Sequence, residues 1–339
     1  MPEYIAGLSK DENSSRIGVL LVNLGTPEKP ETAAVRRYLK QFLWDPRIVE
    51  ISRPLWWLVL NGIILNTRPR KSAHAYQQVW QSDGSPLLTI TLKQARLLNE
   101  AFAKEGADIV VEPAMRYGNP SISEALNKLI EKNARKVLVL PAYPQYSATT
   151  TASVTDEVFD ILKTWRVLPE LRIVNQYYKN NLYIKALVSS IEAYWDQHGK
   201  PDKLVFSFHS IPKRYIDAGD IYQQQCQKTV EMVVDALSLH ANDWIISFQS
   251  RLGREEWVKP YTDHVLEALG KQGIARVDVV CPGFSADCLE TLEEIDQENR
   301  QLFLESGGRE YHYIPALNDR ESHITCLVDV IESQVNNWK

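Results

Sequence analysis

The chain is poor in cysteine and has no paired cysteine motif. Its 339 residues include four cysteines, and no two of them stand in a C-x-x-C pair. Zinc knuckles and iron–sulfur clusters are commonly built on such pairs, so neither group is expected. The first residues are polar and mixed in charge, without the apolar stretch of a secretory signal. We therefore expect a polar leader over residues 1–16, reduced thiols and a cytoplasmic protein.

No apolar run is long enough to cross a bilayer, which takes about 20 residues. The nearest candidate is residues 54–65, a mostly apolar stretch that contains two adjacent tryptophans. Two interpretations stay open. The stretch forms a buried helix, or it forms an apolar lip that touches a membrane surface or covers an apolar ligand. The second interpretation would make the cytoplasmic protein peripherally membrane-associated.

Basic runs and glycine-rich phosphate loops are also missing. The formal net charge is −5, and nucleic-acid binding needs a basic footprint, so we expect no nucleic-acid partner. Neither G-x-G-x-x-G nor G-x-x-x-x-G-K-[ST] occurs. The sequence therefore gives little support for binding of NAD or ATP.

What the chain does contain is an alternation of short apolar runs and helical patterns. The runs predict eight strands, four in each half of the chain. They are Ile17–Leu24, Asp108–Met115, Lys136–Pro141, Leu171–Gln176, Lys203–Phe208, Trp244–Gln249, Val277–Cys281 and Glu310–Pro315. Helices are expected over Pro86–Glu105, Ser121–Lys132, Tyr183–His198, Ile221–Leu239, Pro260–Lys271, Asp287–Ser306 and Arg320–Asn337.

This alternation is typical of parallel sheets wound by right-handed crossovers. We predict an α/β fold of two Rossmann-like domains, each with a four-stranded parallel sheet flanked by helices. The first domain spans 17–178 and the second 179–322, and a C-terminal helix over 323–339 packs back on the first. Residues 26–86 are too long for an ordinary crossover, so we expect a helical insertion at about 40–80.

His209 follows one of these apolar runs directly. In an open parallel sheet, ligands bind at the carboxyl ends of the strands. A histidine there is suited to proton transfer or metal binding, since its ordinary pKa lies near neutrality. The alternative is that His209 only completes a hydrogen-bond network. The other polar and aromatic strand ends predict a binding crevice between the two domains.

A row of carboxylates marks the helix predicted after the seventh strand. Asp287, Glu290, Glu294 and Glu298 are spaced so that they share one side of an α-helix, and no basic residue interrupts them. A solvated helix face is the ordinary fate of such charges. Because aligned like charges repel, we favour a row that holds a cation or passes protons.

With these residues in place, the chain resembles the ferrochelatase family, whose members insert ferrous iron into a porphyrin to make haem. The resemblance runs from about residue 18 to about residue 323, and several independent motifs occur in the right order. They are Val22-Asn-Leu-Gly-Thr-Pro27, Gly84-Ser-Pro86, Met115-Arg-Tyr117, Tyr143-Pro-Gln-Tyr-Ser147, Phe206-Ser-Phe-His-Ser-Ile-Pro212, Phe248-Gln-Ser250 with Trp257, and Asp287-Cys-Leu-Glu-Thr-Leu292.

The resemblance implies chelatase-type domains with the porphyrin in the cleft between them. It implies His209 and Glu290 as the catalytic and metal-binding pair, with Glu294 and Glu298 extending the metal path. In the family, the helix that carries the matching glutamate includes a π-type widening. The residues implied for porphyrin binding are Arg68, Ser85, Met115, Arg116, Tyr117, Tyr143, Trp257 and Asp287.

The chain departs from the family pattern at two points. Cys288 stands where eukaryotic members carry histidine, and the chain ends at Lys339 without the extension that holds an iron–sulfur cluster in some members. We expect no resident cofactor, ferrous iron and porphyrin as substrates, and a monomer. Protoporphyrin IX is the expected porphyrin. Four alternatives stay open: a coproporphyrin ferrochelatase, another metal chelatase, a non-catalytic tetrapyrrole-binding protein and a thiol hydrolase.

Overall fold

The computed structural model describes residues 16–253 and 255–338, so the polar leader predicted over 1–16 lies almost entirely outside the described residues. The chain divides into two compact units. Unit 1 comprises 1–142, 148–175 and 327–339, and unit 2 comprises 143–147 and 176–326. Each unit contains one four-stranded parallel sheet, which confirms the predicted α/β fold.

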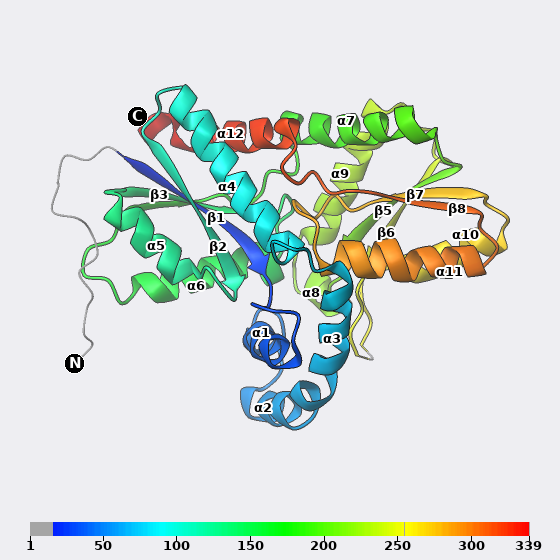
Figure 1. Cartoon of the computed structure of the whole chain (residues 1–339), viewed down its shortest axis with the longest axis horizontal. Coiled ribbons are helices and arrows are strands. Elements are labelled where there is room, and N and C mark those ends of the chain that lie inside the picture. The colour runs from blue at the N-terminus through cyan, green and yellow to red at the C-terminus, as the bar shows by residue number, and fades with distance from the viewer. Residues whose placement is uncertain (1–15, 254, 339) are drawn as a thin grey trace. The chain divides into compact units, whose positions relative to one another are not determined.

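The sheet of unit 1 has the strand order β2-β1-β3-β4. Its strands are β1 Ile17–Gly25, β2 Ile109–Tyr117, β3 Lys136–Pro141 and β4 Glu170–Ile173. Nearly every residue of β1 is buried, which is typical of a central parallel strand covered on both faces. Figure 1 shows α4 (Pro86–Lys104) on one face of this sheet and α5 (Ile122–Glu131) and α6 (Ser153–Leu162) on the other.

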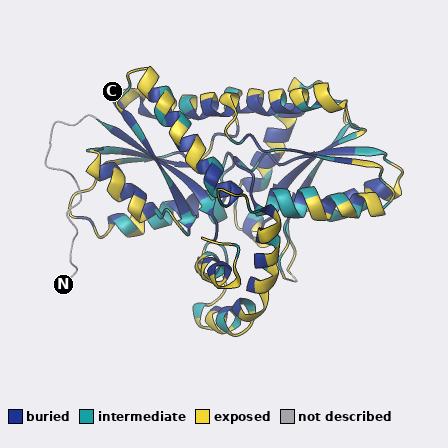
Figure 2. Ribbon diagram, viewed as in Figure 1, coloured by how far each residue is buried: buried dark blue, intermediate teal, exposed yellow. Residues whose placement is uncertain are grey.

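The predicted helical insertion is present in unit 1. It consists of α1 (Thr32–Trp44) and a second helical rod made of α2 (Arg53–Val59), the π-helix η1 (Leu60–Ile64) and α3 (Leu65–Val79). A small core of its own holds the insertion together and includes Trp56, Leu60 and Leu65. Figure 2 shows buried and exposed faces alternating along these helices.

The sheet of unit 2 has the order β6-β5-β7-β8, and its four strands are parallel. They are β5 Lys203–His209, β6 Trp244–Gln249, β7 Arg276–Val280 and β8 Glu310–Ile314. Its helices are α7 Asn181–His198, α8 Lys213–Asp217, α9 Tyr222–Ala236, α10 Thr262–Lys271, the π-helix η3 Glu290–Glu298, and α11 Asn299–Glu305.

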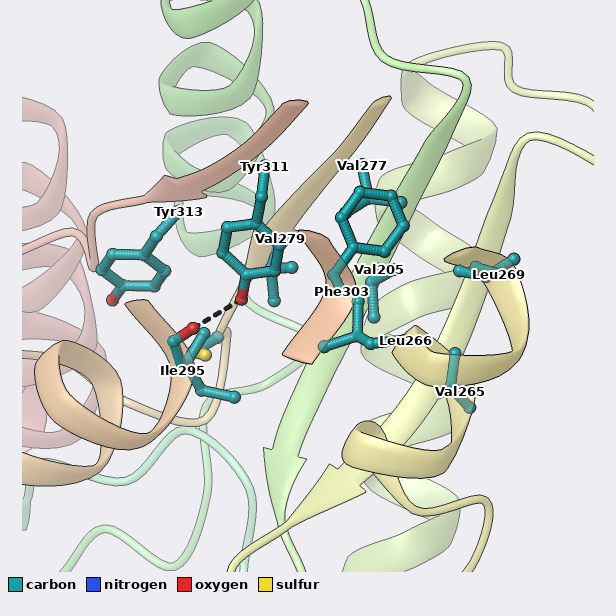
Figure 3. Close-up of a cluster of buried hydrophobic side chains, with 11 residues drawn as sticks. Val205, Val265, Leu266, Leu269, Val277, Val279, Ile295, Phe303, Tyr311 and Tyr313 are labelled. Carbon is teal, nitrogen blue, oxygen red and sulfur yellow. Dashed lines mark hydrogen bonds between the residues drawn. The ribbon is translucent and has the colours of Figure 1, made fainter. Parts of the chain in front are cut away.

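A cluster of buried side chains fixes η3 against the sheet of unit 2 (Figure 3). Ile295 of η3 is fully buried in this cluster, and its carbonyl accepts a hydrogen bond of 2.6 Å from the Tyr311 hydroxyl of β8. Phe303 of α11 is also fully buried. Burying side chains of this size contributes about 1.5–3 kcal/mol each. The cluster therefore holds η3, which carries the carboxylates, in place on the sheet.

The C-terminal segment contains α12 (Glu321–Val335) and a short 3-10 helix, Asn336–Trp338. In unit 1, the Lys136 ammonium donates to the Trp338 carbonyl at 2.7 Å, and the Trp338 indole N–H donates to Glu170. These bonds join the end of the chain to β3 and β4.

Strand and helix ends differ from the predicted ones by a few residues. β2 extends to Tyr117, two residues beyond the predicted end, so Arg116 and Tyr117 belong to a strand instead of the turn after it. β4 ends at Ile173 and not at Gln176. The helix predicted over 287–306 begins only at Leu289, and its first part is a π-helix.

Candidate active site

His209 is the last residue of β5, at the carboxyl end of the unit 2 sheet. Its side chain is half-buried, and it pairs in register with Gln249, the last residue of β6. The His209 Nδ1 lies 2.7 Å from the carbonyl oxygen of Ser210. A carbonyl can only accept, so Nδ1 carries the hydrogen. In the neutral ring, Nε2 is then left as a lone-pair acceptor, able to take a proton or a metal ion.

The π-helix η3 carries three of the predicted carboxylates, Glu290, Glu294 and Glu298. Residues four apart lie close to one face of the helix even with the wider turn of a π-helix. Exposure rises along the row, since Glu290 and Glu294 are half-buried and Glu298 is exposed. The row therefore leads from solvent towards the interior of unit 2.

Glu294 links this row to His209. Burial raises the pKa of Glu294, while bonds from Ser250 and the nearby His209 act to lower it and Glu290 acts to raise it. The Ser250 amide N–H donates to Glu294 Oε1 at 2.8 Å, and the Ser250 hydroxyl donates to Glu294 Oε2. Glu294 thus lies within electrostatic range of both the His209 imidazole and the Glu290 carboxylate.

Asp287 departs from the predicted row. It precedes the helix, so the prediction that it shares a helix face with the glutamates is wrong. Its buried carboxylate accepts from the hydroxyls of Tyr313 and Thr291, from the Asn318 side-chain amide and from the Ala316 N–H. These four donors make Asp287 an anchor for the start of the helix. Its predicted contact with porphyrin stays a prediction.

Cys288 lies beside the site as a buried thiol. Burial raises its pKa, and the neighbouring Glu290, which hydrogen-bonds to it, raises the pKa further. The thiol therefore stays protonated near neutral pH, which argues against a cysteine nucleophile at this position.

In the described part of the chain, no three His, Cys, Asp or Glu side chains are grouped as they would be to hold a metal ion. The predicted metal-binding roles of His209, Glu290, Glu294 and Glu298 stay predictions.

In unit 1, Arg116 and Tyr117 belong to a network centred on Asp45. The Arg116 guanidinium contacts Asp45 Oδ2 at 2.7 Å and Glu157 Oε2 at 2.8 Å, and its Nε donates to Ser153. The Tyr117 hydroxyl, buried with the rest of its side chain, donates to Asp45 at 2.8 Å. Asp45, Arg116 and Glu157 also line a pocket of about 750 Å³ in this unit.

The remaining porphyrin-binding candidates differ in exposure. Arg68 is exposed on α3, whereas Ser85 and Met115 are buried in unit 1, where the Thr26 hydroxyl donates to the Ser85 oxygen at 2.8 Å. In unit 2, Tyr143 and Trp257 are half-buried, and the Trp257 indole N–H donates to the Leu252 carbonyl at 2.9 Å.

Sequence reasoning missed Asp45 and Ser250 as contributors to these networks. Ser250 stands in a motif quoted above, and its position directly after a strand next to Gln249 was a signal for it. Asp45 gave no such signal, because its partners are far away in the sequence.

The fold is the α/β fold of the chelatases. The structure of SirB from Bacillus subtilis with Fe³⁺ is similar with a TM-score of 0.54, 12% identity, and coverage of 95% of this chain and 97% of SirB. The sirohydrochlorin chelatase SirB from Bacillus subtilis subspecies spizizenii, in complex with cobalt, is similar with a TM-score of 0.54, 11% identity, and coverage of 95% and 96%. At this identity, the similarity concerns the fold alone.

The ferrochelatase family model matches residues 16–335, so the chain belongs to the ferrochelatase family. A ferrochelatase from Thioalkalivibrio sulfidiphilus is 53% identical over 323 residues, which are 95% of this chain and 88% of the relative. One from Aromatoleum aromaticum is 52% identical over 324 residues, 95% of this chain and 89% of the relative. One from Methylobacillus flagellatus is 50% identical and covers 96% and 95%.

Proposed function

We propose that this chain is a ferrochelatase that inserts Fe²⁺ into protoporphyrin IX to form protohaem in haem biosynthesis. Family membership and about 50% identity to relatives named ferrochelatase support the activity. The observation that carries the chemistry concerns His209. Its Nδ1 bond to the Ser210 carbonyl leaves Nε2 as an acceptor, and the ring lies in electrostatic range of Glu294 on η3.

The reaction replaces two pyrrole N–H protons with one Fe²⁺ ion, so charge balances without an oxidant or a reductant. In our proposal, His209 Nε2 accepts one pyrrole proton. Glu290 accepts the second proton or holds the incoming ion, and Glu294 and Glu298 extend the path to solvent. Imidazole with carboxylate suits Fe²⁺, and also Zn²⁺ and Co²⁺, so the enzyme should load these metals in vitro.

We assign porphyrin binding to the predicted residues, which fall into three groups by their exposure and their partners. Arg68 is exposed and suited to bind a propionate carboxylate. Tyr143 and Trp257 are half-buried and offer flat faces to a planar ring. Arg116, Tyr117, Ser85, Met115 and Asp287 are held by neighbours or buried, so they would shape the wall without donating free groups.

The direct test is anaerobic incubation of the purified protein with ferrous iron and protoporphyrin IX. Multiple turnovers per enzyme, followed by loss of free-base fluorescence and appearance of the haem spectrum, are expected. A non-catalytic tetrapyrrole carrier would stop at binding without turnover. Parallel assays with coproporphyrin decide the porphyrin, and a higher kcat/KM for coproporphyrin would overturn our choice of protoporphyrin.

We further propose that the enzyme works as a monomer without a resident cofactor. The four cysteines are buried, and burial raises the pKa of the Cys226, Cys281 and Cys288 thiols, which disfavours the thiolates that a cluster requires. Iron and sulfide analysis tests the first point, and light scattering after size-exclusion chromatography tests the second.

The helical insertion supports a further proposal of peripheral membrane contact by a cytoplasmic enzyme. Among the described residues, no helix combines the length and apolarity needed to span a membrane. Large apolar side chains are instead exposed on α2, on η1 and just before α2, and we name this group the apolar lip. It consists of Ile51, Leu55, Trp57, Leu58 and Ile63, which are 42–60% exposed. Such a surface suits interfacial binding of an enzyme whose substrate and product are both poorly soluble in water.

A further inference from the structure

Ser250 has a backbone conformation that is unusual for its residue type. It follows directly after β6, and its φ of 68° lies in the left-handed region. Residues other than glycine adopt this region at a steric cost, and they persist there when the surroundings hold them. The strained serine is the neighbour of Gln249, which pairs in register with His209.

The strained backbone brings two donors of Ser250 to one carboxylate. Its N–H donates to Glu294 Oε1 at 2.8 Å, and its hydroxyl donates to Glu294 Oε2. Both oxygens of Glu294 are thus held by one residue. Two parallel charge-assisted bonds fix direction as well as distance. Glu294 cannot turn towards solvent without breaking both.

Glu294 occupies the middle of the carboxylate row. It lies within electrostatic range of His209 and of Glu290. Its half-buried position contrasts with the exposed Glu298. A carboxylate that hands an ion from the exposed end to Glu290 must face inward, and an unrestrained glutamate side chain would sample many rotamers.

We propose that Ser250 is a positioning residue for iron delivery, because its backbone N–H and hydroxyl together hold Glu294 facing His209 and Glu290. This inference rests on the proposed function. In this proposal, Ser250 holds Glu294 and does not itself bind iron or porphyrin. It acts through Glu294, so its loss weakens the use of ferrous iron and leaves binding of porphyrin unchanged.

The informative variant is Ser250→Gly, because glycine keeps the left-handed backbone and the N–H donor and removes only the hydroxyl. The KM for Fe²⁺ should rise about tenfold, the loss expected for one hydrogen bond to a charged group. Since this loss concerns binding of the ion before the chemical step, kcat should stay within about twofold. The KM for protoporphyrin should not change.

Ser238→Gly is the matched control. Ser238 is also a left-handed serine of unit 2, with a φ of 53°, and it is exposed after α9. Relief of backbone strain should affect thermal stability similarly in both variants, and only Ser250→Gly should alter the iron KM. Ser250→Asn, which tolerates the left-handed region and restores a side-chain donor, should recover part of the loss.

A double-variant cycle separates positioning from a structural role. In a Glu294→Ala background there is no carboxylate to hold, so Ser250→Gly should add no further increase in the iron KM. A full additional increase in that background would overturn the inference, as would an unchanged iron KM in Ser250→Gly alone. If the wild-type protein formed no metalloporphyrin at all, the proposed function itself would be wrong. If the wild type were active and Ser250→Gly left the KM for Fe²⁺ unchanged, only the role of Ser250 would be refuted.

Discussion

The Tyr117 hydroxyl donates a hydrogen bond of 2.8 Å to Asp45, a residue 72 positions away at the end of the first insertion helix. Burial raises the pKa of Tyr117, and the negative charge of the Asp45 carboxylate raises it further. The phenol therefore keeps its proton and stays a hydrogen-bond donor. The same carboxylate pairs with Arg116 and accepts from the Ser153 hydroxyl at 2.6 Å. Asp45 therefore joins the helical insertion to β2 and α6.

Asp45→Ala should destabilise the protein by about 3 kcal/mol, because it leaves a largely buried guanidinium and two hydroxyls without their shared acceptor. The free energy of unfolding in urea at neutral pH measures this. Asp108→Ala is the control, since its ion pair with Arg16 is 42–53% exposed and should contribute less than about 1 kcal/mol. Equal losses in both variants would mean that the Asp45 network adds no stability.

His209→Ala should lower kcat for metal insertion by about 100-fold or more, as expected for removal of a general base. The binding of protoporphyrin, measured by quenching of protein fluorescence, should change little, because the variant removes a reacting group and not the pocket. His240→Ala, at an exposed histidine in the same unit, should behave as the wild type. A His209→Ala enzyme with near-normal turnover would contradict the assignment.

The carboxylate row predicts a gradient of effects. Glu290→Gln should reduce kcat strongly, because Glu290 is half-buried and acts on Glu294, which is in electrostatic range of His209. Glu298→Gln should mainly raise the KM for Fe²⁺ by a few-fold, since Glu298 is exposed at the far end of η3. Steady-state rates over a range of iron concentrations test both. A stronger effect at Glu298 than at Glu290 would reverse the proposed direction of the path.

The apolar lip gives a prediction about lipid. The double variant Leu58→Glu with Ile63→Glu should bind vesicles of anionic phospholipid at least about tenfold more weakly than the wild type, because each change removes apolar area available for burial in the interface. Vesicle flotation measures the binding. The control is Val167→Glu with Leu168→Glu, which alters side chains of similar exposure elsewhere in unit 1. Equal binding by both double variants and the wild type would exclude the lip as a lipid contact.

Much of the fold was predictable because the central strands of a covered parallel sheet are short apolar runs. β3 and β6 begin and end at the predicted residues. The type of the helix after β7 was not visible in the spacing of Glu290, Glu294 and Glu298, because positions four apart share a face in α- and π-helices alike. The π-helix was expected only from the family resemblance.

The placement of single side chains was harder to predict. Asp287 continues the acidic spacing but accepts four hydrogen bonds before the helix begins, and its donors Tyr313 and Asn318 belong to later elements. The sequence placed Arg116 among the porphyrin-binding residues but gave no sign of its ion pair with Asp45, 71 residues away. Such pairs depend on how a helical insertion packs on a sheet, and the local sequence pattern does not predict that packing.

His323 predicts an acid-sensitive component of stability. The side chain is fully buried, and burial lowers its pKa to about 4 from an ordinary 6.5, so the native protein holds it neutral with its Nδ1–H bonded to the Asn318 carbonyl at 2.7 Å. The unfolded chain binds the proton more readily between these two values. Stability from His323 is therefore complete above pH 6.5 and is lost as the pH falls towards 4.

Between pH 7 and pH 5, this single group should reduce the free energy of unfolding by about 2 kcal/mol. His323→Asn keeps a side-chain N–H donor and cannot titrate, so its loss over the same interval should be smaller by that amount. Urea unfolding of the wild type, His323→Asn and the exposed-site control His240→Asn at both pH values tests this. If His323→Asn and the wild type lost stability in parallel, the acid sensitivity would have to come from other groups.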